Sequence, residues 1–219
     1  MTKTNSGRFL EDYSIGQVID HAVPRTVSGG ERALYHALYP ARHALYSSDE
    51  FARGCGLAKS PIDDLVVFHV VFGKTVPDVS LNAVANLGYA EGRWILPVYE
   101  GDTLRSRSTV IGLQQNSNGK TGVVYVHTQG FNQNKEVVME YVRWVMVRKR
   151  DVDAPAPETV VPELAKALSP GDLVLPAGLD FSNYIAVGPS FSAGVSDGSL
   201  FLASQNNSWP NIMSMEFAK

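Results

Sequence analysis

The sequence has little cysteine, no long apolar run and no large excess of charge of either sign. A single cysteine, Cys55, among 219 residues excludes an internal disulfide and any metal site built from several cysteines. The longest strongly apolar stretch, 65–72, contains His69 and is far shorter than the roughly 20 residues that cross a bilayer. No apolar run follows Lys3, which argues against a signal peptide. We therefore expect a cytoplasmic protein without membrane association.

Other absences narrow the function further. A formal net charge of −3 argues against a broad surface for nucleic acid. The histidines His21, His36 and His127 lack the spacing of metal ligands, and glycine-rich phosphate loops are missing. We therefore expect no metal and no cofactor. The hydrophobic content of 44% is enough for a folded core.

The chain divides into three regions by composition. Residues 7–150 carry a dense periodic apolar pattern and are predicted to form one domain. Residues 151–176 contain Pro155, Pro157 and Pro162 among alanines, which is typical of a linker. Residues 177–219 are rich in Ser, Gly and Asn and form a poorly patterned tail.

The segment 61–75 is predicted to form a central helix. Pro61 suits a first helical turn, and Asp63 and Asp64 favour the positive end of a helix dipole. Its body is apolar nearly all round, which predicts a helix enclosed by other elements. The β-branched residues favour a strand instead, but the length without turn signals favours the helix. Shorter helices are expected at 31–39 and 49–54.

Strands dominate after the central helix, and Asn/Gly turns between them predict antiparallel pairing. On the last strand, alternate residues from Val137 to Val147 share one apolar face, on which Arg143 is the exception. A curved sheet of this kind needs a cover on its concave face, and the central helix can supply it. The fold class is therefore α+β, an antiparallel curved sheet wrapped around a long central helix. The predicted strands are 17–27, 83–94, 102–113, 121–130 and 137–147.

A sheet wrapped around a helix is the hot-dog fold, and several strings make the resemblance specific. The segment GRFLEDYSIGQ at 7–17 resembles the first segment of the MaoC-like hydratases, as does GDTL at 101–104. The strings FGKTVPD at 72–78 and WVMVRKR at 144–150 are similar to one branch of that family, the mesaconyl-CoA hydratases. The resemblance extends from Gly7 to about Tyr184.

The resemblance implies reversible addition of water to the α,β double bond of an enoyl-CoA thioester. MaoC-like hydratases use an Asp and a His from one loop, and a Gly amide at the start of the central helix as oxyanion donor. The matching positions here hold Ala41, Tyr46 and Leu65, so all three features are missing. This chain thus resembles the half of a double hot dog that has lost catalysis and shapes the acyl pocket. Only about forty residues follow the linker, so we expect a truncated chain, either a natural truncation or the product of a frame shift near 186–188.

No catalytic residue is assigned, but four residues are candidates for substrate binding: Arg42, His43, Tyr46 and Asp63. The guanidinium of Arg42 suits the free carboxylate of a mesaconyl group. The simpler alternatives are an exposed loop for Arg42 and His43, packing for Tyr46, and dipole complementarity for Asp63.

Two functions are carried forward from the sequence. In the first, the chain is the acyl-binding half of a hydro-lyase that converts an acyl-CoA thioester substrate, mesaconyl-CoA, to β-methylmalyl-CoA. In the second, it is an inactive hot-dog protein that binds an acyl-CoA or a partner subunit. An uncovered sheet edge predicts a homo-oligomer such as a dimer in both cases.

Overall fold

The computed structural model describes residues 7–39, 43–164, 195–196 and 199–200. These residues divide between two compact units, and each is described by itself. The first unit contains residues up to Leu38 and from Pro61 to Ala165. The second contains Tyr39–Ser60 and the end of the chain. The predicted division into a domain at 7–150, a linker and a tail stays a prediction.

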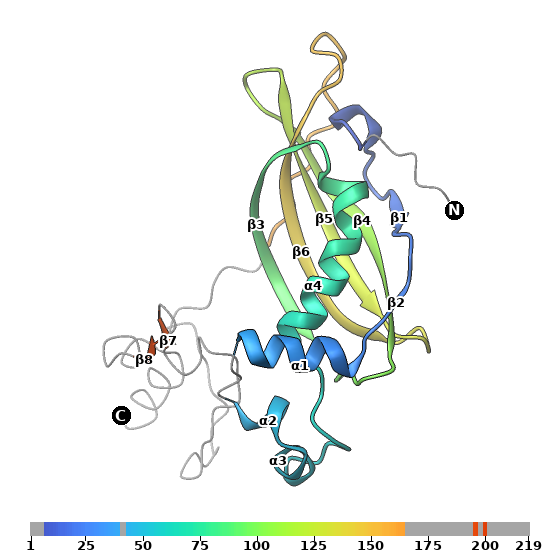
Figure 1. The fold of residues 1–219 in the computed structure, drawn as a ribbon. Coiled ribbons are helices and arrows are strands. Elements are labelled where there is room, and N and C mark those ends of the chain that lie inside the picture. The colour runs from blue at the N-terminus through green and yellow to red at the C-terminus, as the bar shows by residue number, and fades with distance from the viewer. Residues whose placement is uncertain (1–6, 40–42, 165–194, 197–198, 201–219) are drawn as a thin grey trace, which may run out of the picture. The chain divides into compact units, whose positions relative to one another are not determined.

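A six-stranded antiparallel sheet forms the first unit (Figure 1). Its main order is β1-β4-β5-β6-β3, and β2 also pairs with β4. Four long strands make most of the sheet, and their predicted positions are confirmed to within two residues. The strands are β1 (Val18–Asp20), β2 (Arg25–Thr26), β3 (Ala83–Trp94), β4 (Thr103–Gln115), β5 (Thr121–Phe131) and β6 (Val137–Arg148).

The sheet differs from the prediction in two ways: one expected strand is interrupted, and β3 pairs with a different strand than expected. The expected strand 17–27 is interrupted, because Val23 has a left-handed φ of 68° and Pro24 has no amide proton to donate. The strands β4, β5 and β6 form the expected meander, but β3 pairs with β6 and not with its successor β4. As a result, β3 is the last strand of the sheet.

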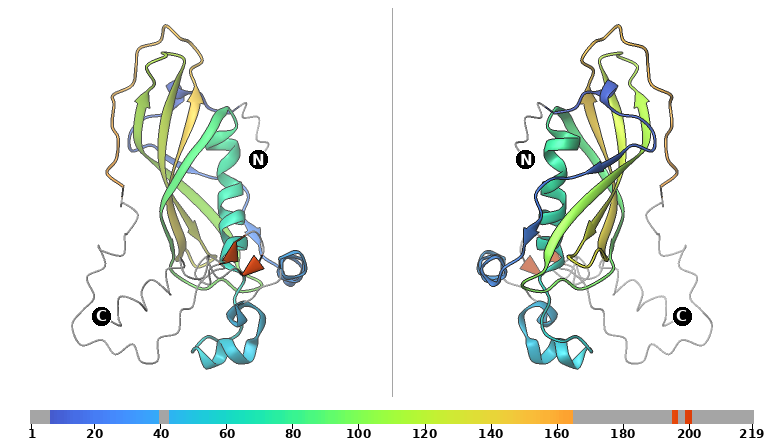
Figure 2. Two further views of the ribbon diagram at one scale, coloured as in Figure 1. Left: turned by 90° about the vertical axis from the view of Figure 1, so that its left-hand side faces the viewer. Right: turned by 90° about the vertical axis from the view of Figure 1, so that its right-hand side faces the viewer.

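The helix α4 (Asp64–Thr75) lies along the concave face of the sheet, as Figures 1 and 2 show. Its valines, Val66, Val67, Val70 and Val71, pack with Leu104 and Met139 of the sheet in one buried cluster. The helix α1 (Gly29–Leu38) adds Tyr35 to the edge of this cluster. The central helix wrapped by a sheet is thus confirmed.

Two details of the predicted helix are wrong. Pro61 is not in its first turn, because the next amide, that of Ile62, donates to the Val98 carbonyl at 2.7 Å and holds this segment extended. The helix is also not enclosed all round, since Leu65, His69 and Gly73 form an exposed stripe. These residues are four apart and therefore lie on one side of the helix, away from the sheet.

The N-terminal segment of the first unit contacts the residues that follow β6, and these residues also pair with β4. The short 3-10 helix η1 (Leu10–Asp12) places the Glu11 carboxylate against the backbone amides of Arg150 and Asp151. After β6, Val160 pairs with Leu113 of β4 through two backbone hydrogen bonds. The described part of the predicted linker is therefore partly bound to the sheet.

The second unit contains two short helices, α2 (Ala44–Ser47) and α3 (Asp49–Gly54), and the two-residue strands β7 (Val195–Ser196) and β8 (Ser199–Leu200). The helix expected at 49–54 is confirmed. Ser48 begins it by accepting a hydrogen bond from the Phe51 amide at 3.2 Å.

Candidate functional site

The N-terminal end of α4 is capped by Asp63. Asp63 has extended backbone, and its carboxylate accepts a hydrogen bond from the Leu65 amide at 2.9 Å. Leu65 occupies the position at which the resemblance implies an oxyanion-stabilising amide. That amide is already engaged by a carboxylate, so it cannot donate to a developing oxyanion without losing the cap.

The surroundings of Asp63 are half-buried. Burial raises the pKa of the Asp63 carboxyl, while the Leu65 amide and the nearby His36 and His69 act in the opposite direction. At the same end of the helix, Trp94 Nε1 donates to the Asp64 carbonyl at 2.9 Å and joins β3 to α4. The contacts of Asp63 thus explain it as a cap, and its predicted substrate role stays a proposal.

Four aromatic residues form a continuous cluster between α4 and the strands β3 and β6. Phe68 and Phe72 of α4 stack with a centroid separation of 5.5 Å. Phe68 also meets Tyr89 at 5.7 Å and Tyr141 at 5.3 Å, both edge to face. Tyr89 is 44% exposed and Tyr141 only 2%. The aromatic cluster therefore extends from the surface at β3 to the inside of the sheet.

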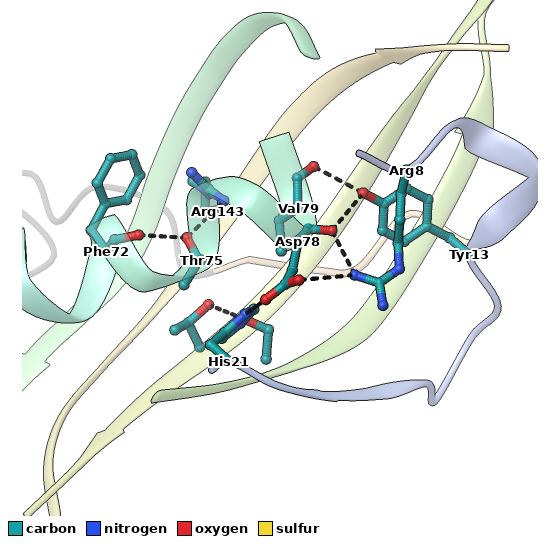
Figure 3. A network of polar contacts seen from close by, with 10 residues as sticks. Arg8, Tyr13, His21, Phe72, Thr75, Asp78, Val79 and Arg143 are labelled. Carbon is teal, nitrogen blue, oxygen red and sulfur yellow. Dashed lines mark hydrogen bonds and ion pairs between the residues drawn. The ribbon is translucent and has the colours of Figure 1, made fainter. Parts of the chain in front are cut away.

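Arg143 lies at the inner end of the aromatic cluster and is completely buried. Its guanidinium is 4.7 Å from the centre of the Phe72 ring, and Nη2 donates to Thr75 Oγ1 at 3.1 Å. Figure 3 shows this arginine beside Thr75 at the end of α4. Burial lowers the pKa of Arg143 from its usual value, and the phenol groups of Tyr141, Tyr89 and Tyr13 partly oppose this effect.

A separate buried chain of polar groups joins the N-terminal segment to the π-helix η2 (Val76–Ser80) that follows α4 (Figure 3). His21 Nδ1 lies 2.8 Å from Asp78 Oδ2, and His21 Nε2 lies 2.7 Å from Ser108 Oγ. Ser108 in turn lies 2.8 Å from Thr128 Oγ1. Arg8 Nη1 donates to the Asp78 carbonyl at 2.8 Å and approaches its carboxylate at 3.8 Å. Both ring nitrogens of His21 are thus engaged, one by the Asp78 carboxylate and one by the Ser108 hydroxyl.

The order carboxylate, imidazole, hydroxyl is also that of a nucleophilic triad. Here the Ser108 hydroxyl is already engaged by both His21 and Thr128, and it lies in the buried core. The network instead anchors the segments on both sides of β1, through Arg8 and His21, to η2 after α4. Sequence reasoning missed it, because His21 and Asp78 are 57 positions apart and form no local motif.

The loop residues expected to bind substrate lie in the second unit. His43 begins α2 and accepts a hydrogen bond from the Leu45 amide at Nδ1, 3.2 Å away. The structure brings His43 together with Tyr46, at a ring separation of 6.2 Å, and with Phe51 at 6.0 Å. Tyr46 is buried. Arg42, like Ala41, lies outside the described residues, and Asp63 belongs to the first unit.

The part of the chain that the structure describes contains no group of three or more His, Cys, Asp or Glu residues placed to hold a metal ion. Cys55 is exposed and unbonded. None of the described helices is long and apolar enough to cross a membrane.

Comparison with known proteins agrees with this architecture. The family model of mesaconyl-CoA hydratase matches residues 1–188. The mesaconyl-CoA hydratase of Cereibacter sphaeroides is 71% identical over 182 residues, which are 83% of this chain and 53% of that protein. A MaoC domain dehydratase structure from Chloroflexus aurantiacus is 57% identical with a TM-score of 0.73, over 90% of this chain and 55% of that one.

A third similarity concerns the fold. A Mycobacterium tuberculosis protein described as a double hot-dog fold has a TM-score of 0.59 at 26% identity, over 87% of this chain and 60% of that one. The fold and the site thus define a MaoC-like hot-dog protein. Within that class, the chain belongs to the mesaconyl-CoA hydratase family. It spans about half the length of the relative from C. sphaeroides.

Proposed function

We propose that this chain is the acyl-binding half of a hydro-lyase that adds water to a short branched enoyl-CoA, converting mesaconyl-CoA to β-methylmalyl-CoA. The similarity to a mesaconyl-CoA hydratase, 71% identity over 182 residues, carries the substrate assignment. Because the chain matches about half of that protein, the chemical step is assigned to a second hot-dog half.

The local geometry supports a non-catalytic role for this half. A hydratase of this kind needs a base for water, an acid for the α-carbon and donors for the thioester oxygen. The Leu65 amide is bound by the Asp63 carboxylate, and Tyr46 is buried in packing with His43. Ala41 has no group that could act as a base. The aromatic cluster of Phe68, Phe72, Tyr89 and Tyr141 is the acyl-binding wall in this proposal.

The exposed edge strand supports association with another hot-dog module as part of the same proposal. β3 is the last strand of the described sheet, so its outer edge carries backbone groups free to pair. Its apolar side chains Val84, Leu87, Tyr89 and Trp94 are 42–48% exposed. In this proposal the occupant of that edge is a second copy of this chain. A monomeric mass by light scattering at micromolar concentration would contradict it.

The purified full chain tests the proposed function directly. Loss of the enoyl-thioester absorbance of mesaconyl-CoA measures turnover, and a binding titration measures affinity. We expect saturable binding without turnover above buffer. Truncating the acyl-binding wall in Phe68→Leu is expected to weaken binding, whereas Tyr125→Leu on the opposite face of the sheet is the matched control. Turnover by the chain alone would refute the non-catalytic role, and absence of any binding would refute the acyl-binding role.

The cytoplasmic location expected from the sequence belongs to the same proposal. Its support is the single, unbonded cysteine, which fits a reducing compartment.

A further inference from the structure

Arg143 is an unusual residue for the inside of a sheet. It is completely buried, yet no carboxylate among the described residues pairs with it. Its hydrogen bonds go to neutral hydroxyls, Thr75 Oγ1 at 3.1 Å, Ser80 Oγ at 3.5 Å and the phenol of Tyr89. The Nε group has no hydrogen-bond partner in the described part of the chain. A buried guanidinium in this state retains its positive charge and lacks its strongest kind of partner.

A second buried donor, the Tyr141 hydroxyl, lies on the same face of β6 as Arg143. The Tyr141 hydroxyl is buried and has no hydrogen bond of good geometry, although it lies near Thr75 and Thr128. Tyr141 and Arg143 are two positions apart on β6, so both side chains point from the sheet towards α4. The two groups are close enough to interact electrostatically. Burial raises the pKa of the Tyr141 hydroxyl, and the positive charge of Arg143 lowers it by a smaller amount.

We propose that Arg143 and the Tyr141 hydroxyl together bind the free carboxylate of a dicarboxylic acyl-CoA thioester. This inference rests on the proposed function and assigns the residues that select its substrate. Mesaconyl-CoA carries one carboxyl group as the thioester and the other as a free carboxylate, which can accept from the guanidinium and from the phenol. A carboxylate would therefore supply both the missing charge and the missing hydrogen bonds.

The aromatic cluster provides the approach to this pair. Phe72 lies over the guanidinium and is only half-buried, and the cluster continues through Phe68 to the exposed Tyr89. In this inference the Phe72 side chain moves aside to admit the carboxylate to Arg143. The acyl chain then lies against the aromatic rings, with its carboxylate innermost.

A comparison of the binding of two thioesters tests this inference separately from the proposed function. Mesaconyl-CoA has the free carboxylate, whereas crotonyl-CoA is a short enoyl-CoA without it. Titration of the full chain with each ester is expected to give binding of mesaconyl-CoA that is tighter by about 10-fold to 100-fold, the range for a hydrogen bond to a charged group. Failure of both esters to bind would overturn the proposed function, and this inference with it.

Variants then test the two residues. Tyr141→Phe removes one oxygen and keeps the ring, so we expect the preference for mesaconyl-CoA over crotonyl-CoA to fall by about 10-fold. Arg143→Met is expected to abolish the preference, with folding checked by circular dichroism. Arg107→Met, which changes a surface arginine paired with Asp20, is the matched control and should leave both affinities unchanged. Equal affinity for the two esters, or an unchanged preference in Tyr141→Phe, would overturn the inference while leaving the proposed function standing.

Discussion

The position of the central helix depends on a glycine in the strand beneath it. A methyl group added at Gly130 of β5 would lie 2.7 Å from Val71 Cγ2 and 3.2 Å from Met139 Cγ. Both neighbouring side chains are completely buried and have no room to retreat. Because Gly130 does not have a left-handed backbone, Gly130→Ala tests this close approach and not backbone strain.

The size of the effect follows from packing. Overfilling a close-packed core costs about 1–3 kcal/mol, and the loss of chain freedom in the unfolded state returns up to about 1 kcal/mol. We therefore expect Gly130→Ala to lower the free energy of unfolding by about 1–2 kcal/mol. Val71→Ala removes two buried methyl groups and should cost about 2–3 kcal/mol. In the double variant the new methyl occupies the space that Val71 leaves, so the sum should overestimate the loss by about 1–2 kcal/mol.

Urea unfolding followed by tryptophan fluorescence measures all three variants, with free energies taken from the midpoint and slope. Gly73→Ala is the control, because Gly73 is in the same helix and a methyl group there meets nothing within 4 Å. That variant should gain up to about 1 kcal/mol from helix propensity. Strictly additive losses in the double variant would refute the contact between the helix and β5 as the cause.

Three further predictions concern the polar contacts. His21→Ala removes the 2.8 Å partner of the buried Asp78 carboxylate and one of the two partners of the Ser108 hydroxyl, and should cost about 3 kcal/mol in urea unfolding. His127→Ala removes a partly exposed contact with Glu140 and should cost less than about 1 kcal/mol, and equal losses would contradict the argument. Burial raises the pKa of Asp63, so its contribution to stability is greatest below its unfolded pKa and is lost as the pH rises through the folded value. Asp63→Asn keeps the cap and should remove this decline when urea unfolding is followed from acid to neutral pH. Burial raises the pKa of Glu11, but the amides of Arg150 and Asp151 outweigh it, so the net pKa is lowered and the contribution is lost as the pH falls through the folded value. Glu11→Gln should cost no more than about 1 kcal/mol at neutral pH and progressively less as the pH falls, and a loss that stays constant into acid would contradict it.

The sequence alone determined the elements of the first unit. Turn clusters bounded the four long strands, and the alternation along β6 identified the face that meets α4. The same alternation marked Arg143 as the exception on an apolar face, because side-chain direction in a strand is fixed by its two-residue period. Motif strings were long enough to show the family before any coordinates, as the match over residues 1–188 confirms.

The tertiary structure decided which distant groups meet. Pairing of β3 with β6 depends on the path between strands, which local pattern does not encode. The contact of His21 with Asp78, and the neutral hydroxyls that the described residues place beside Arg143, depend on segments brought together only when the sheet packs on the helix. Whether a buried charge has an oppositely charged partner depends on residues from several elements, and only tertiary packing brings those elements together. The sequence therefore named the family, while the fold showed where a charged substrate group could be held.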